Sequence, residues 1–160
     1  MSQRAEQLAA TFEAICGELV AAVAGCTDAQ WQRPSTAEGW PVNVLAHHVA
    51  EVQGAFNQIL SRLATGETYT PGSSMERVHA SNQQHAREYA GVGKAEVLDL
   101  LQANGAAGVE LIRRLSDGQL DQAAGVYGGN PLSVGQVVEW IIIGHASEHL
   151  ESLRATLVAD

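Results

Sequence analysis

The segment SVGQVVEWIIIGHASEHL, residues 133–150, decides the fold class of this chain. Its apolar side chains recur at spacings of three and four, which is the period of an α-helix with one buried face. Ser133 precedes the first apolar residue, and Gln136 three positions later completes a capping box that predicts the helix start. The pattern continues to about Val158, so we expect one long amphipathic helix that packs against other helices.

The same period appears in four earlier segments, and no alternating run predicts a strand. The expected helical segments are Gln3–Ala24, Pro41–Ala64, Ser74–Ala90 and Lys94–Leu115, with a short capped turn at Asp28–Trp31. Loops rich in Gly, Pro and Ser separate them, and a Gly-rich loop runs through residues 127–131. We therefore predict an all-α, antiparallel four-helix bundle, whose third element is either one bent helix or two helices.

The composition is that of one globular domain spanning residues 1–160. Hydrophobic residues make up 46% of the chain and charged residues 17%, which excludes a disordered chain. The net charge of −9 disfavours binding to nucleic acid or to an anionic membrane surface, because both need clustered positive charge. No run reaches the roughly 20 apolar residues of a membrane span. The N-terminus lacks a signal-peptide pattern, so we expect a cytoplasmic protein.

Three histidines are expected to point into the bundle. His145 and His149 are four residues apart, so they lie on one side of the last helix, within its apolar arc. On the helix expected over residues 41–64, His48 lies roughly 60° from the apolar stripe, whereas His47 lies roughly 160° away and is expected on the solvent side. Three imidazoles from two helices make a ligand set for a divalent transition metal, zinc or nickel first, with iron or manganese as alternatives.

The alternative is that each histidine is a core residue that hydrogen-bonds to a carbonyl or carboxylate. Two other polar residues are candidates for catalysis. Glu148 lies at the edge of the apolar arc, where it is either an acceptor for a histidine N–H, a general base or a rim charge. Asn82 lies in an apolar stripe with Val78 and Tyr89, where it either orients a ligand or ties two helices together.

Two motifs together resemble the DinB-like superfamily. Residues 39–51, GWPVNVLAHHVAE, resemble its second helix, in which a tryptophan opens the helix and a ligand histidine follows eight positions later. Counted from Trp40, that histidine is His48. Residues 133–150 resemble the superfamily's last helix, with its His-x-x-x-His pair at His145 and His149, and residues 115–120 resemble the turn before it.

The resemblance covers the whole chain and implies a four-helix bundle that binds a divalent metal and commonly dimerises. Characterised members include mycothiol-dependent maleylpyruvate isomerases and bacterial thiol S-transferases. In the isomerases one ligand of the last helix is often glutamate, and an extra C-terminal domain follows. This chain has His145 and His149 at both positions and is too short for that domain, so it is closer to the general three-histidine type.

These observations favour a metal-dependent enzyme, either a thiol-dependent S-transferase or a hydrolase, that acts on a small molecule. The metal would lower the pKa of a bound thiol or water molecule. Cys16 and Cys26 are expected to be reduced structural thiols, so a reacting thiol would be a low-molecular-weight co-substrate. The alternatives are a non-catalytic stress-response bundle that binds a metal or small ligand, and a purely structural bundle. A homodimer is expected mainly from the resemblance.

Overall fold

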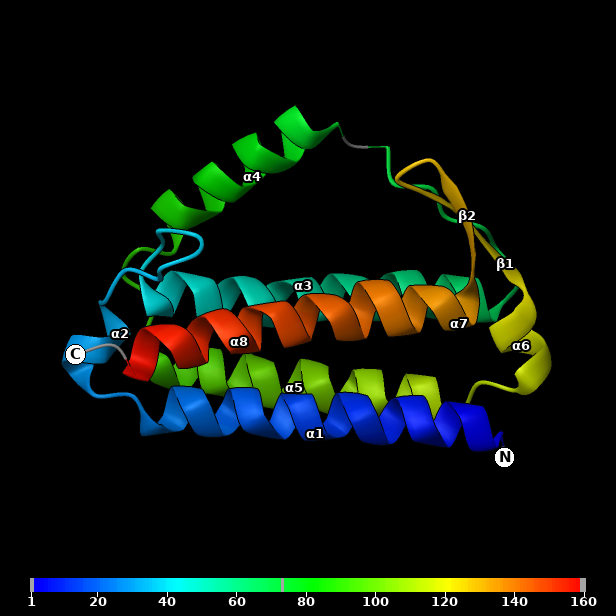
Figure 1. Ribbon diagram of the computed structural model, residues 1–160, viewed down its shortest axis with the longest axis horizontal. Coiled ribbons are helices and arrows are strands. Elements are labelled where there is room, and N and C mark those ends of the chain that lie inside the picture. The colour runs from blue at the N-terminus through cyan, green and yellow to red at the C-terminus, as the bar shows by residue number, and fades with distance from the viewer. Residues whose placement is uncertain (1, 73, 159–160) are drawn as a thin grey trace.

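Four long helices lie side by side in the computed structural model, which describes residues 2–72 and 74–158 (Figure 1). They are α1 (Gln3–Gly25), α3 (Val42–Ala64), α5 (Lys94–Arg113) and a last helix built from α7 (Val134–Gln136), η1 (Val137–Ile143) and α8 (Gly144–Val158). Both α5 and α8 pack against α1 and α3, which closes the ring of helices. The predicted four-helix bundle is confirmed.

The directions of the four helices follow from one crossover. α1 is antiparallel to α5, and α3 is antiparallel to α8, whereas α3 and α5 run in the same direction (Figure 1). The parallel pair forms because the chain passes back over the bundle through α4 (Met75–Glu88) before α5 begins. The third predicted element is therefore two helices, and the first of them lies outside the bundle.

Side-chain caps begin several of the helices. Thr27, Ser116 and Ser133 each accept a hydrogen bond from a backbone N–H three residues later, and a glutamine at that position completes each capping box. The helices that these caps open are α2 (Asp28–Trp31), α6 (Asp117–Asp121) and α7. α3 begins directly after Pro41, whose fixed φ suits the start of a helix. The predicted starts of α2, α3 and the last helix are thus confirmed.

The prediction that the chain forms no strand is wrong at one place. β1 (Ala123–Tyr127) and β2 (Asn130–Ser133) pair antiparallel where a Gly-rich loop was expected. The turn between them uses Gly128 and Gly129 at φ 57° and 85°, values that other residues rarely adopt. The strands are short and their register shifts near Gly125, so no alternating pattern marks them in the sequence.

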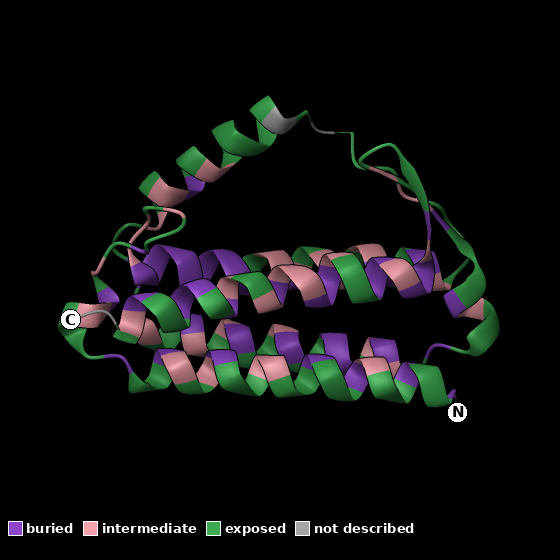
Figure 2. Cartoon of the chain, in the orientation of Figure 1, coloured by how far each residue is buried: buried purple, intermediate pink, exposed green. Residues whose placement is uncertain are grey.

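This hairpin holds the start of the crossover. The backbone N–H of Tyr69 donates to the carbonyl of Ala124 at 2.7 Å, and that of Val126 donates to the hydroxyl of Thr70 at 3.1 Å. From there α4 returns across the bundle with mostly exposed side chains (Figure 2). Val78, expected in an inward stripe, is 36% exposed, so α4 adds little to the core.

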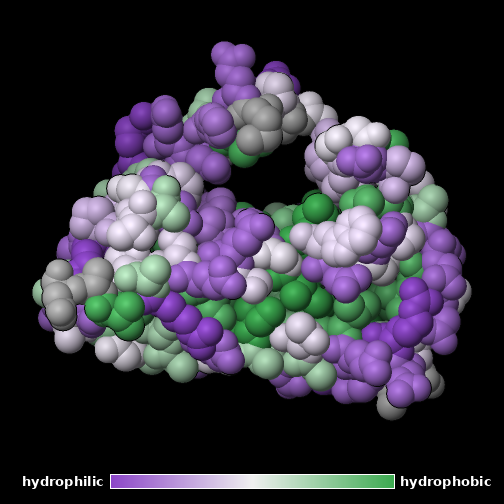
Figure 3. Space-filling model, in the orientation of Figure 1, coloured by the Kyte–Doolittle hydropathy of each residue, from purple (hydrophilic) through white to green (hydrophobic). Residues whose placement is uncertain are grey.

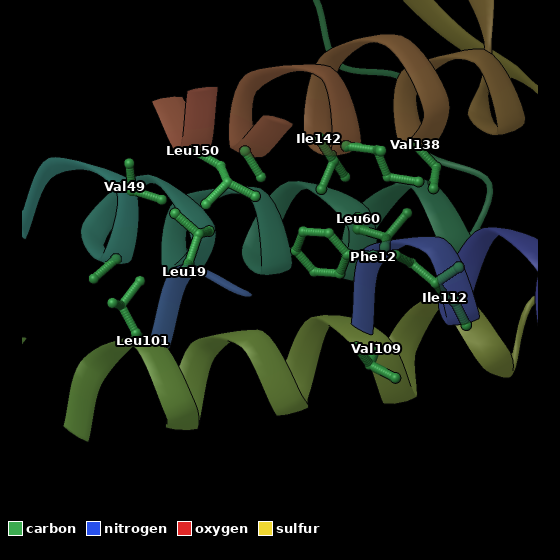
Figure 4. Close-up of a cluster of buried hydrophobic side chains, with 14 of the residues drawn as sticks. Phe12, Leu19, Val49, Leu60, Leu101, Val109, Ile112, Val138, Ile142 and Leu150 are labelled. Carbon is green, nitrogen blue, oxygen red and sulfur yellow. The ribbon is translucent and has the colours of Figure 1, made fainter. Parts of the chain in front are cut away.

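The core consists of aliphatic side chains from the bundle helices packed around Phe12 (Figure 4). Two glycines on α5 let its backbone approach the neighbouring helices closely. A Cβ at Gly108 would lie 2.7 Å from Oδ1 of Asn57 and 2.8 Å from Cε1 of Phe12. A Cβ at Gly105 would lie 3.1 Å from Sγ of Cys16. The spacing between α5 and its neighbours therefore depends on the absence of side chains at these two positions.

Among the described helices, α1 alone is long and apolar enough to cross a membrane, but the core helix of a bundle passes the same test. Ala5, Phe12 and Leu19 on α1 are fully buried within the protein. α1 therefore serves here as a bundle helix, packed against α5 and α8.

Replacing Gly108 with alanine should destabilise the bundle. The added methyl group must displace Asn57 or Phe12, and overpacking of this kind costs about 1–3 kcal/mol. Most of that range exceeds the ~1 kcal/mol that alanine gains over glycine inside a helix. Gly17→Ala is the matched control, because nothing lies within 4 Å of the added Cβ, and it should stabilise α1. Urea unfolding measures both changes, and a Gly108→Ala protein as stable as wild type would contradict the close approach.

Candidate metal centre

Three imidazoles converge where α3 meets α8. His48 lies on α3, and His145 and His149 lie one turn apart on α8. One ring nitrogen of each histidine lies within 4.8 Å of a ring nitrogen of the other two, and the ring centroids are 4.5–5.4 Å apart. The structure thus brings together the three histidines that the sequence pattern indicated.

The last helix is not a regular α-helix in the segment N-terminal to the two histidines. η1 is a π-helical segment, in which each turn holds more residues than in an α-helix. Residues beyond it are therefore rotated relative to an ideal α-helix counted from Val134. His145 and His149 keep their spacing because both lie within α8, but Glu148 lies on its exposed side.

A carboxylate from a distant loop completes the site. Glu38 lies between α2 and α3, and its Oε1 accepts a hydrogen bond from Nδ1 of His149 at 3.0 Å. Its Oε2 accepts hydrogen bonds from the hydroxyls of Ser35 and Ser152 at 2.7 and 2.6 Å. Because Nδ1 of His149 is engaged in this bond, its Nε2 is the nitrogen left to bind a metal.

Burial keeps two of the imidazoles neutral. It lowers the pKa of His48 to about 4 and that of His145 to about 3, and the neighbouring His149 adds to both shifts. Burial acts to raise the pKa of Glu38, but the hydrogen bonds from the two serines and His149 outweigh it and lower the pKa. At neutral pH the site therefore holds neutral imidazole donors beside a carboxylate.

Aromatic side chains enclose the imidazoles. Trp40, two residues before α3, meets His48 edge-on with 5.4 Å between the ring centroids. Phe56, farther along α3, meets His145 edge-on at 5.5 Å. These partly buried rings cover two sides of the cluster with apolar surface. Apolar surroundings lower the local dielectric, which strengthens electrostatic interactions.

A second polar cluster adjoins the first along α3, because the ring of its His85 meets that of His48 edge-on with 5.5 Å between the centroids. His47 is 3% exposed, so the prediction that it lies on the solvent side is wrong. Its ring stacks on Tyr89 at 3.7 Å, and its Nδ1 lies 3.3 Å from Nε2 of His85. Nδ1 of His85 lies 2.9 Å from Oε2 of Glu51. The end of α4 and the residue after it cover the face of α3 that was expected to meet solvent.

Neither predicted catalytic candidate joins the three histidines. Glu148 is exposed on α8, and Asn82 is partly exposed on α4, with no side-chain hydrogen bond among the residues that the structure describes. Glu38, which does join them, is 111 positions from His149 in the sequence and lies in a loop without helical period. The signal that was available is the S-x-x-E spacing of Ser35 and Glu38, which resembles a capping pattern but has no helix behind it.

A helical bundle with converging histidines places this chain in the class of DinB-like four-helix bundles, as the sequence resemblance predicted. The family model of the mycothiol maleylpyruvate isomerase N-terminal domain matches residues 12–144 of this chain. The chain belongs to this family. Comparison with curated proteins finds no match.

Two solved structures share the fold. YfiT from Bacillus subtilis, described as a probable metal-dependent hydrolase with an unusual four-helix bundle topology, is 18% identical. Its TM-score is 0.77 over 98% of this chain and 87% of YfiT. A mycothiol-dependent maleylpyruvate isomerase is 16% identical, with a TM-score of 0.73 over 93% of this chain. The match spans 60% of the isomerase, and at these identities both comparisons show the fold alone.

The metal-free protein should lose stability as the pH falls from about 7 to about 4. The pKa values of His48 and His145 in the folded protein, about 4 and about 3, lie below the ordinary value of 6.5. The unfolded chain therefore binds protons in this range that the folded chain does not bind. The contribution of the two rings to the free energy of unfolding is full at pH values above the ordinary pKa of 6.5. It decreases as the pH falls below 6.5 and is lost once the pH has passed through the pKa values of about 4 and about 3 in the folded protein.

Urea unfolding of the chelator-treated protein across this range measures the loss. His145→Gln should flatten the pH dependence, because glutamine does not titrate, and His79→Gln is the control because His79 is exposed on α4. Equal pH dependence in wild type and His145→Gln would contradict the proton uptake assigned to His145.

Proposed function

We propose that this chain is a metal-dependent enzyme that acts on a small molecule through a divalent transition metal bound by His48, His145 and His149. The observation that supports this best is the convergence of three largely buried imidazoles from two helices. Three imidazole nitrogens leave coordination positions open for a reactant, unlike the four protein ligands of a structural zinc site. We infer zinc or nickel first, with iron or manganese as alternatives. A homodimer, expected from the family resemblance, is part of this proposal.

The surrounding residues fit this role. Glu38 holds the His149 ring in the tautomer that frees Nε2, and Ser35 and Ser152 hold Glu38. When bound, a divalent metal supplies Lewis acidity and lowers the pKa of a coordinated water molecule or thiol. Trp40 limits the entry of bulk water, so the reactant and the ligands meet in a low-dielectric site.

Neither cysteine is placed to supply a reacting thiolate. Cys16 lies on α1 beside Gly105 and Gln53, where burial raises its pKa to about 12. Cys26 is buried after the end of α1, donates to the carbonyl of Ala22, and has a pKa that burial also raises. A thiol-dependent reaction would therefore take its thiol from solution, as a low-molecular-weight co-substrate.

We infer that the reaction is hydrolysis or thiol S-transfer. Two structures that share the fold support this choice, since YfiT is described as a probable metal-dependent hydrolase and the isomerase as dependent on mycothiol. An apolar pocket of about 470 Å³ borders the last helix, lined by Tyr127, Leu132, Trp140 and Ile141 among others. Ile141 is four residues before His145, and Figure 3 shows apolar side chains on the bundle surface below the crossover. A small substrate with an apolar group fits this surface.

Removing a ligand should remove the metal. His48→Ala, His145→Ala and His149→Ala should each lower the zinc or nickel content by about one ion per chain after dialysis, measured by elemental analysis. Glu38→Gln keeps all three ligands but loses the carboxylate that orients His149, so its metal affinity should fall about 10–100-fold. His79→Ala is the control, because its exposed ring lies on α4. Unchanged metal content in all three ligand variants would contradict the proposed centre.

An activity assay separates the enzyme from a non-catalytic binding bundle. Zinc- or nickel-loaded protein is incubated with 1-chloro-2,4-dinitrobenzene and a panel of thiols, and separately with p-nitrophenyl acetate. We expect turnover, in one of the two assays, that the His48→Ala variant lacks. If wild type keeps its metal yet shows no turnover above His48→Ala in either assay, the proposal of an enzyme fails. The stress-response binding bundle is then the better account.

A further inference from the structure

We propose a second divalent-metal site, formed by His47, Glu51 and His85, where the end of α4 meets α3. One donor atom of each residue lies within 4.8 Å of a donor atom of the other two. The site shares no ligand with the proposed centre at His48 and goes beyond the proposed function. It would take a borderline transition ion such as Zn²⁺, Fe²⁺ or Co²⁺.

The distances between the donors suit a metal ion. His47 and Glu51 are four residues apart on α3, so their side chains lie on the same face, one turn apart. His85 approaches from α4, with Nδ1 2.9 Å from Oε2 of Glu51 and Nε2 3.3 Å from Nδ1 of His47. Ligand atoms that bind one zinc ion at about 2.0–2.2 Å lie roughly 3 Å apart when adjacent. One ion binds only one ring nitrogen of His85, so these two short distances do not belong to a single donor set. A set with one donor atom from each residue lies within 4.8 Å, and rotation of the exposed Glu51 side chain would bring its separations toward 3 Å.

The cluster is buried on the side of its two histidines and exposed to solvent on the side of Glu51. His47 and His85 are 3% and 8% exposed, whereas the side chain of Glu51 is 53% exposed. The ring of Tyr89 stacks on His47 at 3.7 Å and restrains its orientation. Two imidazoles held in place before binding lose little freedom when an ion arrives, which favours binding.

A solvent groove of about 510 Å³ leads to the cluster. Glu51, Glu96 and the amide of Asn104 line it, and the described residues around it include no lysine or arginine. The groove therefore carries negative charge, which attracts cations and repels anionic ligands. A metal cation is the ligand whose charge fits both the groove and the donor set.

The donor types select the class of ion. Two imidazoles and one carboxylate are ligands of zinc and of non-haem iron, whereas Ca²⁺ and Mg²⁺ prefer oxygen donors throughout. The same three residues also form a hydrogen-bonded chain from Glu51 through His85 to His47. A test must therefore tell a metal site from a chain of hydrogen bonds.

An ion at this site would join α4 to the bundle. Among the described side chains of α4, that of His85 is buried and the others are exposed or half-buried. Because two ligands come from α3 and one from α4, a bound ion would oppose separation of the two helices. Metal binding here should thus slow the local opening of α4.

The test uses a variant in which the proposed centre is disabled, so that its outcome does not depend on the proposed function. His145→Ala combined with His149→Ala removes two of the three ligands there and leaves the second cluster intact. Titration with Co²⁺, followed by visible absorption and equilibrium dialysis, should show about one ion bound per chain. Circular dichroism confirms that the double variant folds, and wild type with two bound ions serves as a second background if it does not.

Glu51→Gln in this background separates the two readings of the cluster. Glutamine still accepts a hydrogen bond from His85 but is a poor metal ligand, so Co²⁺ affinity should fall at least about tenfold. Glu96→Gln removes the same charge from the same groove without touching the ligand set, and it should change the affinity less than Glu51→Gln does. Co²⁺ affinities that are equal in Glu51→Gln and Glu96→Gln would overturn the site, as would a double variant that binds no Co²⁺.

Proteolysis gives an independent readout. Arg77 and Arg87 are exposed on α4 and offer trypsin two cleavage positions. Co²⁺ should slow cleavage at these positions in the double variant and leave the rate in its Glu51→Gln derivative nearly unchanged. Equal slowing in both proteins would overturn the role of Glu51 as a ligand.

Discussion

A buried imidazole without a partner costs several kcal/mol, and this bundle brings together one buried and two partly buried imidazoles where α3 meets α8. The carboxylate of Glu38 accepts a hydrogen bond from His149, and the hydroxyls of Ser35 and Ser152 donate hydrogen bonds to Glu38. The nitrogens that face one another lie within 4.8 Å, so movements of the rings by about 1 Å or less would let them share one ion. The loop before α3, the start of α3 and the whole of α8 are therefore held by one polar cluster in an otherwise apolar core.

The crossover explains the rest of the architecture. α3 and α5 run in the same direction, so the chain must return along the full length of the bundle between them (Figure 1). The hairpin binds the beginning of this connection through Tyr69, and the contacts of His85 and Tyr89 with His47 bind its end. The crossover helix α4, which this topology requires, thus also brings the imidazole of His85 to His47 and Glu51.

Much of the fold was predictable because its causes are local. The cap at Thr27 and the capping box at Ser133 act within a few residues, and both were confirmed. The helix predicted from residue 133 onward was also confirmed, although residues 137–143 of it are π-helical. The hairpin was not predictable, because its strands are short and its pairing depends on two glycines with positive φ. The position of α4 outside the bundle was also not predictable, because an apolar stripe on a helix does not indicate which other element it packs against.

For the candidate site, the sequence by itself determined that His145 and His149 share one helix face and that His48 projects from the inward side of another helix. Both follow from 3.6 residues per turn, which is a property of neighbouring residues. Only the tertiary structure decided that Glu38 meets His149 and that His85 buries His47, since these pairs are 111 and 38 positions apart. Contacts at such separations arise from the packing of whole helices, which no local period encodes.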